Sequence, residues 1–168
     1  MNSSPRHPRR PIGRQLLGLA GWVGVAFAAA GVGAIASIDA AAFYAKLEKP
    51  AWAPPASVFG PVWSVLYLLI GVSAWLVWRE PGDHRRALGW WTAQLLANTL
   101  WSWLFFRWMQ GALAFADAVL LLLLVAITLV AFWRVRRLAA VLLVPYLAWV
   151  GFAAALTWQI WRSNPGLR

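Results

Sequence analysis

Five long apolar segments dominate the 168-residue chain, and they leave few folds open to it. They cover residues 16–38, 58–78, 87–106, 112–133 and 138–161. Each reaches the roughly 20 residues that a helix needs to cross about 30 Å of hydrocarbon. Lipid offers the backbone no hydrogen-bond partner, so each segment should be a helix. The sequence therefore predicts an all-α membrane protein, a bundle of five transmembrane helices.

The composition agrees with that prediction and narrows the chemistry. Hydrophobic residues make up 62% of the chain and charged residues 12%, about half the charged share of a typical soluble domain. The absence of cysteine excludes disulfides, thiolate metal sites and cysteine nucleophiles. Five spans use most of the chain, so we expect one membrane domain over residues 15–163. A basic tail precedes it at 1–14, and a short tail follows at 164–168.

The net charge of +10 is distributed unevenly around the predicted spans. Ten basic residues fall on the side of the N-terminus and five on the other side, which places the N-terminus in the cytoplasm by the positive-inside rule. We therefore expect the bilayer, and not nucleic acid, to be the partner of these charges. The ten are Arg6, Arg9, Arg10, Arg14, Arg79, Arg85, Arg86, Arg134, Arg136 and Arg137; the five are Lys46, Lys49, Arg107, Arg162 and Arg168.

The connection at residues 39–57 is long and broken by prolines. Pro50, Pro54 and Pro55 stiffen it into extended or turn geometry. It also carries Tyr44 and Trp52. A loop of this length is often a functional lid, and the alternative is a surface connector that tucks its aromatic rings into the membrane interface.

Fourteen tryptophans accompany the apolar segments. Those near segment ends fit the membrane interface, whereas Trp63, Trp101 and Trp149 lie deep inside and must fill the core or line a site for a flat apolar ligand. Helical phase puts these rings and the polar residues of the spans on one face per helix, and these faces should converge on one interior. The faces are Trp63, Tyr67, Ile70 and Ala74; Gln94, Asn98, Trp101 and Phe105; Asp117, Leu121, Leu124 and Thr128; and Tyr146, Trp149, Ala153, Thr157 and Ile160.

That interior has little of the equipment for classical catalysis. Asp117 is the one acidic residue inside a predicted span, so there is no carboxylate pair for acid–base work. His7 and His84 lie outside the spans, and no metal-ligand spacing or nucleophile triad is present. We predict no catalytic residue and no metal site. The interior is suited to stacking and a few hydrogen bonds, which favours ligand binding over catalysis. Asp117 should have a partner inside the bundle such as a neighbouring hydroxyl.

Four ordered motifs resemble the TspO/MBR family of tryptophan-rich sensory proteins and translocator proteins. The resemblance covers everything after the basic tail. Its residues are Phe43-Tyr44, Leu47-Glu48-Lys49-Pro50, Trp52 and Pro54-Pro55; Pro61, Trp63 and Leu66-Tyr67; Gln94-Leu95, Asn98, Trp101-Ser102 and Phe105-Phe106; and Pro145-Tyr146 and Trp149.

The resemblance implies a five-helix bundle whose first extramembrane loop covers a porphyrin pocket. The implied ligand-binding residues are Tyr44, Trp52, Trp63, Tyr67, Gln94, Asn98, Trp101, Phe105, Tyr146 and Trp149. Porphyrin would be a ligand, with no obligatory cofactor, and the protein a sensor or regulator in a bacterial cell envelope. A carrier and a light-dependent porphyrin-degrading enzyme stay open as alternatives. Gln94 and Asn98 could instead serve only to join helices.

Two positions depart from the family pattern. Thr157 stands where the family usually has an asparagine, so a hydroxyl replaces an amide at the deep end of the pocket. The weak sterol pattern fails after Tyr146, since residues 147–151 contain no cation. Sterol binding therefore gains no support.

A homodimer is predicted through the third span. Gly89, Ala93 and Ala97 are spaced by four residues, a pattern that lets helix backbones approach closely. The stripe lies about 110° from the face that carries Gln94 and Asn98, so one helix could serve both pocket and partner. The alternative is that the stripe packs against another helix of the same bundle.

Overall fold

A computed structural model of the chain describes residues 11–167. The basic tail with Arg6, Arg9 and Arg10, together with Arg168, lies outside these residues. Within them the chain is helical and contains no strand. The elements are α1 (Ile12–Ala36), α2 (Ala40–Lys46), η1 (Ala56–Val58), α3 (Phe59–Trp78), α4 (Arg85–Ser102), η2 (Trp103–Arg107), α5 (Gly111–Val135), α6 (Arg137–Val141) and α7 (Val144–Ser163). The predicted all-α class is confirmed.

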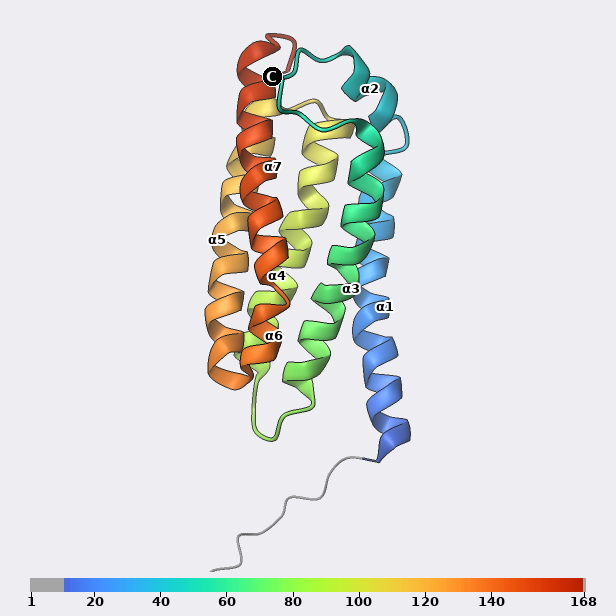
Figure 1. Cartoon of the computed structure of the whole chain (residues 1–168), viewed down its shortest axis with the longest axis vertical. Coiled ribbons are helices and arrows are strands. Elements are labelled where there is room, and N and C mark those ends of the chain that lie inside the picture. Colours follow the sequence, from blue (N-terminus) through green and yellow to red (C-terminus); the bar gives the residue numbers. More distant parts are fainter. Residues whose placement is uncertain (1–10, 168) are drawn as a thin grey trace, which may run out of the picture.

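The long helices run up and down the length of one bundle (Figure 1). Helix α4 packs against α1 and α5, α5 packs against α7, and α1 packs against α3. One end of the bundle carries α2, the turn after η2 and the C-terminus (Figure 1). The other end carries the connection between α3 and α4 and the short helix α6. The basic groups at residues 79–86 and 134–137 thus share one end, opposite α2, and there Arg136 pairs with Glu80.

The predicted number of five membrane spans is not matched. Four described helical stretches are long and apolar enough to cross a membrane: Ile12–Ala36, Ala56–Trp78, Gly111–Val135 and Arg137–Ser163. Helix α4 is not among these four because its mean hydropathy is too low. Two arginines begin the helix, and Gln94 and Asn98 lie inside it. It nevertheless lies inside the bundle, with Trp91, Gln94 and Asn98 buried.

Helices α1 and α3 touch closely in the half of the bundle away from α2. A Cβ on Gly71 would lie 2.7 Å from the Cα of Val23, so the side chain of any other residue would force the backbones apart. One and a half turns further toward that end, Gly18 lies against the ring of Trp78. Helix α3 is also tied to α4, since the buried indole of Trp91 donates to the carbonyl of Ile70 at 3.0 Å. These contacts hold α1, α3 and α4 together at one end.

The long connection at residues 39–57 was predicted to be extended or turned, but part of it is helical. It begins with α2, for which the run Ala40-Ala41-Ala42 provides high helix propensity. The chain is extended at Leu47 and then turns at residues 51–52, where Ala53 N donates to Pro50 O at 2.9 Å. A second departure ends α4, where η2 is a turn of π-helix closed by the bond from Trp108 N to Trp103 O at 2.8 Å.

Candidate functional site

A cavity of about 610 Å³ lies in the half of the bundle beneath α2. Helices α1, α2, α3, α4 and α7 and the π-helical turn η2 contribute its walls. The volume falls within the roughly 300–1,000 Å³ of small-molecule sites. Its aromatic lining consists of Phe27, Tyr44, Phe59, Trp63, Tyr67, Trp101, Phe105, Phe106 and Trp149.

The aromatic rings of the wall are organised in pairs. Trp101 and Phe105 stack, with ring centroids 5.2 Å apart and planes 9° from parallel. Across the cavity, Phe59 meets Trp149 edge-on with centroids 6.0 Å apart. Trp63 lies 5.6 Å from Tyr67. Offset and edge-to-face pairs of this kind are favourable beyond their buried area, so they give the cavity fixed, flat surfaces.

A chain of buried hydrogen bonds runs behind one wall and joins α3, α4 and α7. The hydroxyl of Tyr67 donates to Asn98 Oδ1 at 2.7 Å. The Nδ2 of Asn98 donates to the hydroxyl of Tyr146 at 2.8 Å, and that hydroxyl donates to Gln94 Oε1 at 2.8 Å. Tyr67 and Asn98 line the cavity, whereas Gln94 and Tyr146 lie behind it. The network therefore fixes the wall from the rear.

Four buried polar atoms have no hydrogen-bond partner among residues 11–167. Two are the indole nitrogens of Trp101 and Trp149, which belong to cavity-lining residues. The others are Nε2 of Gln94 and Oδ2 of Asp117. The hydroxyl partner expected for Asp117 is thus not found at that oxygen. All four atoms are themselves covered by protein.

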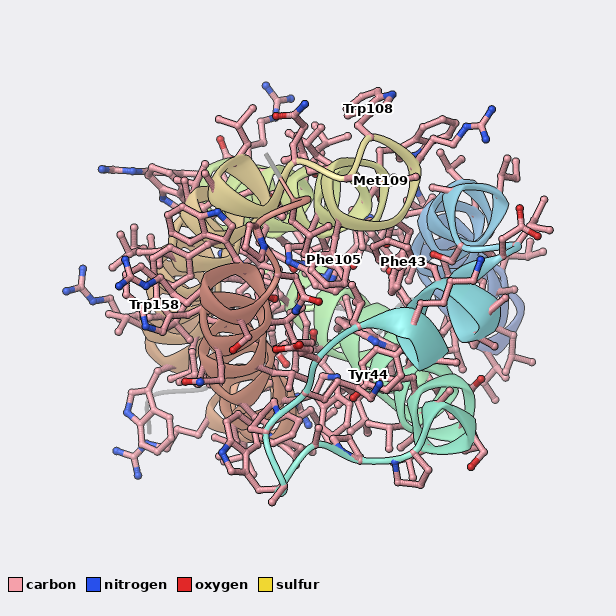
Figure 2. The ribbon with its side chains drawn as sticks, turned by 90° about the horizontal axis from the view of Figure 1, so that it is seen from above. Phe43, Tyr44, Phe105, Trp108, Met109 and Trp158 are labelled. Carbon is pink, nitrogen blue, oxygen red and sulfur yellow. The ribbon has the colours of Figure 1, made fainter. Side chains whose placement is uncertain are left out.

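Helix α2 and the segment after it lie over one end of the bundle (Figure 2), and Ala40, Ala41 and Tyr44 of α2 line the cavity there. The hydroxyl of Tyr44 donates to the carbonyl of Pro54 at 3.0 Å, which ties α2 to the far end of the loop. Burial raises the pKa of Tyr44 above its ordinary value, so the hydroxyl keeps its proton and remains a donor. Phe43 meets Phe105 edge-on at 5.9 Å, and Figure 2 shows the two near the middle of the bundle.

The loop is also fastened to the end of α7. The side chain of Asn164 bonds twice to the backbone of Glu48: Glu48 N donates to Oδ1 at 2.9 Å, and Nδ2 donates to Glu48 O at 2.9 Å. The ammonium of Lys49 donates to the carbonyls of Tyr44 and Leu47, each at 2.7 Å. We call the Asn164–Glu48 pair the clasp.

Seven of the ten predicted ligand-binding residues line the cavity, and three do not. The seven are Tyr44, Trp63, Tyr67, Asn98, Trp101, Phe105 and Trp149. Gln94 and Tyr146 support the wall. Trp52 is 51% exposed and rests edge-on against Phe152 on the outside of α7. Whether the seven bind a ligand stays a prediction.

One wall of the cavity was not predicted from the sequence. Phe27, Ala30, Gly31 and Ala34 of α1 line it, but small apolar residues in a first span give no signal of their own. Ser102 and Phe106, at the junction of α4 and η2, were visible in the motif but not selected. Thr157 also lines the cavity, yet its hydroxyl donates to Ala153 O of its own helix at 2.8 Å. The Thr157 hydroxyl therefore bonds within α7 and does not take the place of an amide's hydrogen bonds in the cavity.

A metal centre finds no support in the described part of the chain. No three histidine, cysteine, aspartate or glutamate side chains come together there in a way that could hold an ion. The cavity is therefore a site of aromatic surfaces with a few polar groups.

Comparison with known proteins finds a family and relatives that match most of the chain. The model of the TspO/MBR family matches residues 22–162. The chain belongs to the TspO/MBR family. It is 43% identical to the human translocator protein over 130 residues, which are 75% of this chain and 77% of that protein. It is 42% identical to the protein CrtK of Rhodobacter capsulatus over 146 residues, 84% and 90% of the two chains.

A TspO/MBR relative from Chlorobaculum tepidum, the tryptophan-rich protein TspO, is 34% identical over 157 residues, 90% of this chain and 99% of that one. The region matched by the family model contains the cavity, the buried network and the whole loop at residues 39–57. With its long apolar helices, membership of the TspO/MBR family identifies the chain as an integral membrane protein.

Proposed function

We propose that this protein binds a tetrapyrrole such as a porphyrin in the cavity beneath α2 and acts as a membrane sensor or regulator. The observation that carries the proposal is the cavity itself, with tryptophan rings from three helices around about 610 Å³. A flat conjugated ring stacks on such faces, at about 0.5–1.5 kcal/mol per ring pair beyond the area buried.

We further propose that α4 with η2 forms a fifth transmembrane segment. The amides of Gln94 and Asn98 face the bundle, where both bond to Tyr146 of α7. Lipid would meet mainly residues such as Leu96 and Leu100, which are exposed. The end with α2 would face away from the cytoplasm, because arginines gather at the opposite end. A cysteine replacing Ser57 should then react with an impermeant thiol reagent from outside, and one replacing Asp83 only after permeabilisation. The reverse labelling would contradict this orientation.

The bacterial cell envelope is the proposed location, and the relatives from Rhodobacter capsulatus and Chlorobaculum tepidum support it.

We also propose a homodimer through α4, with fewer residues at the interface than the three predicted from the sequence. Ala97 is 7% exposed because its own chain covers it, so it is not available to a partner. Gly89 is exposed, and a Cβ there would meet nothing within 4 Å. Gly89→Leu should shift the detergent-solubilised protein toward monomer; an unchanged dimer would reject this surface.

The test of binding is a porphyrin titration of the protein in lipid nanodiscs, followed by tryptophan fluorescence. Trp63→Ala and Trp149→Ala should each weaken binding several-fold, because each removes a ring from the cavity wall. Trp133→Ala is the matched control: that ring is about half exposed and outside the cavity, and it should bind as wild type does.

Equal binding by all four proteins would place the ligand elsewhere, and no quenching in the wild type would reject the proposed ligand. The same samples test the enzyme alternative. A porphyrin absorption band that disappears under light only with wild-type protein would identify degradation and not sensing.

A further inference from the structure

The cavity is not sealed, so its boundaries define the path by which a ligand can reach it. This inference rests on the proposed function, because it concerns access to the same cavity. The end beneath α2 is held by three hydrogen bonds at two places. The clasp joins Glu48 to Asn164, and Tyr44 bonds to Pro54 across the loop. A path over this end requires those bonds to break.

The boundary between α1 and α4 is closed by direct contact. A Cβ on Gly33 would lie 3.2 Å from Oγ of Ser102, so the two helices meet at the level of the cavity. The hydroxyl of Thr99 donates to the carbonyl of Ala29 at 3.4 Å one turn further along. No space for a planar ring remains between helices at this spacing.

The boundary between α3 and α7 is filled by aromatic rings. Phe59 meets Trp149 at 6.0 Å, and Trp63 meets Tyr146 at 6.2 Å, both between ring centroids. These pairs span from one helix to the other. On the outside, the ring of Trp52 from the loop lies on Phe152. The four paired rings of α3 and α7, with Trp52 and Phe152 beside them, close this side.

The boundary between α1 and α3 is different in its two halves. In the half away from α2, Gly71 and Val23 are in contact, and Phe27 and Tyr67 lie 6.3 Å apart above them. In the half near α2, the lining becomes small: Gly31 and Ala34 from α1, Gly60 and Ser64 from α3. The two helices that touch through glycine at one end are separated by the cavity at the other.

The space around two glycines shows that the half of this boundary near α2 is open. A Cβ built on Gly31 or on Gly60 would meet no atom within 4 Å, although both residues line the cavity. Phe27 and Ile38 also line the cavity and yet are 41% and 77% exposed. They thus border the cavity and the outside of the bundle at once, which marks them as the lower and upper rim of an opening.

The position of this opening determines what lies outside it. Gly31 is five residues before the end of α1, about 8 Å along the axis at 1.5 Å per residue. In a span of this length that depth corresponds to the shallow acyl region of one leaflet. The geometry points to a lateral portal between α1 and α3 beneath α2, through which a flat, apolar, membrane-dissolved ligand passes between the cavity and the surrounding acyl chains. Such a ligand can leave lipid for the cavity without crossing water.

The test is to narrow the portal where added atoms meet no neighbour. Gly31→Leu, Gly60→Leu and the double variant should fold, since their Cβ positions are open. Protoporphyrin IX association and dissociation are measured in nanodiscs by stopped-flow tryptophan quenching. In the double variant the association and dissociation rate constants should both fall at least tenfold, and these rate constants, not the equilibrium Kd, are the readout. The control is Gly21→Leu, at an open position of α1 that does not line the cavity, and its rates should stay within twofold of wild type.

A second variant tests the competing path over α2. Asn164→Ala removes the clasp and leaves the portal intact, so its rates should stay within twofold of wild type. Rates that rise in Asn164→Ala, together with wild-type rates in the double glycine variant, would place access at the lid and overturn the portal.

A third measurement does not require porphyrin to bind, so failure of the proposed function and failure of the portal are separable. The chain has no cysteine, so Gly31→Cys carries a single bimane label. Quenching by lipids with a nitroxide high on the acyl chain, and weak quenching by aqueous iodide, is expected for a portal open to the bilayer. Strong iodide quenching without lipid quenching would overturn it even if the wild type binds protoporphyrin.

Discussion

Asn98 of α4 donates a 2.8 Å hydrogen bond to the hydroxyl of Tyr146 of α7, and this contact joins two helices across the centre of the bundle. The same hydroxyl donates to Gln94, and Asn98 accepts from Tyr67. Only Tyr67 and Asn98 reach the cavity. The amides therefore act in part as the helix-joining groups that were the alternative to ligand contacts, and they position the wall on which the rings sit.

Removing the hydroxyl at the centre of this network should destabilise the bundle. Tyr146→Phe leaves Nδ2 of Asn98 and Oε1 of Gln94 buried without that partner, at an expected cost of about 1–3 kcal/mol. Reversible unfolding in mixed micelles measures it. Thr92→Val is the control, because Thr92 is exposed and bonds only to its own helix, so the change should stay within about 0.5 kcal/mol. Equal effects of the two variants would show that the network adds no stability.

The close contact of α1 and α3 should not tolerate a methyl group. Gly71→Ala places a Cβ 2.7 Å from the Cα of Val23, where backbone cannot rotate away, and overpacking of this kind costs about 1–3 kcal/mol. Gly60→Ala, on the same helix, adds its methyl to open space and should leave the unfolding temperature unchanged. If Gly71→Ala is as stable as Gly60→Ala, α1 and α3 do not approach as described.

The clasp should control how firmly the loop is held, separately from ligand access. Asn164→Ala removes both bonds to Glu48 and the bond from Nδ2 to Ile160 O. Amide hydrogen exchange at Glu48 should accelerate at least tenfold, because its N–H loses its acceptor. Exchange in the buried half of α3 should not change. Unaltered exchange at Glu48 would show that other contacts hold the loop.

Helical phase was enough to predict the inward faces of the bundle. Polar and aromatic residues spaced by three and four were expected to converge, and Tyr67, Asn98 and Tyr146 do so in one hydrogen-bonded chain. Such residues are costly in lipid, so their position on a helix fixes which side turns inward. That argument extends to any span that carries them.

Other features had no comparable signal. The α1 wall of the cavity is built from residues such as Ala30 and Gly31, which suit lipid and interior equally well. The π-helical turn η2 depends on how Trp108 and Gln110 bond back to the helix, a tertiary outcome. The motif placed Trp52 in the pocket, but the turn of the loop at residues 51–52 puts its ring against Phe152 of α7 and not in the cavity lining. Here the path of the loop decided the result.

The most direct test of the central claim fills the cavity and leaves the rest of the protein alone. Ala153 lines the cavity from α7, so Ala153→Phe projects a ring into the proposed binding space. Ala116→Phe adds the same ring to an exposed position of α5 outside the cavity and serves as the matched control. In a protoporphyrin titration in nanodiscs, with folding checked by the unfolding temperature, Ala153→Phe should lose at least tenfold in affinity and Ala116→Phe should match wild type. Wild-type affinity in a folded Ala153→Phe protein would contradict the assignment of this cavity as the tetrapyrrole site.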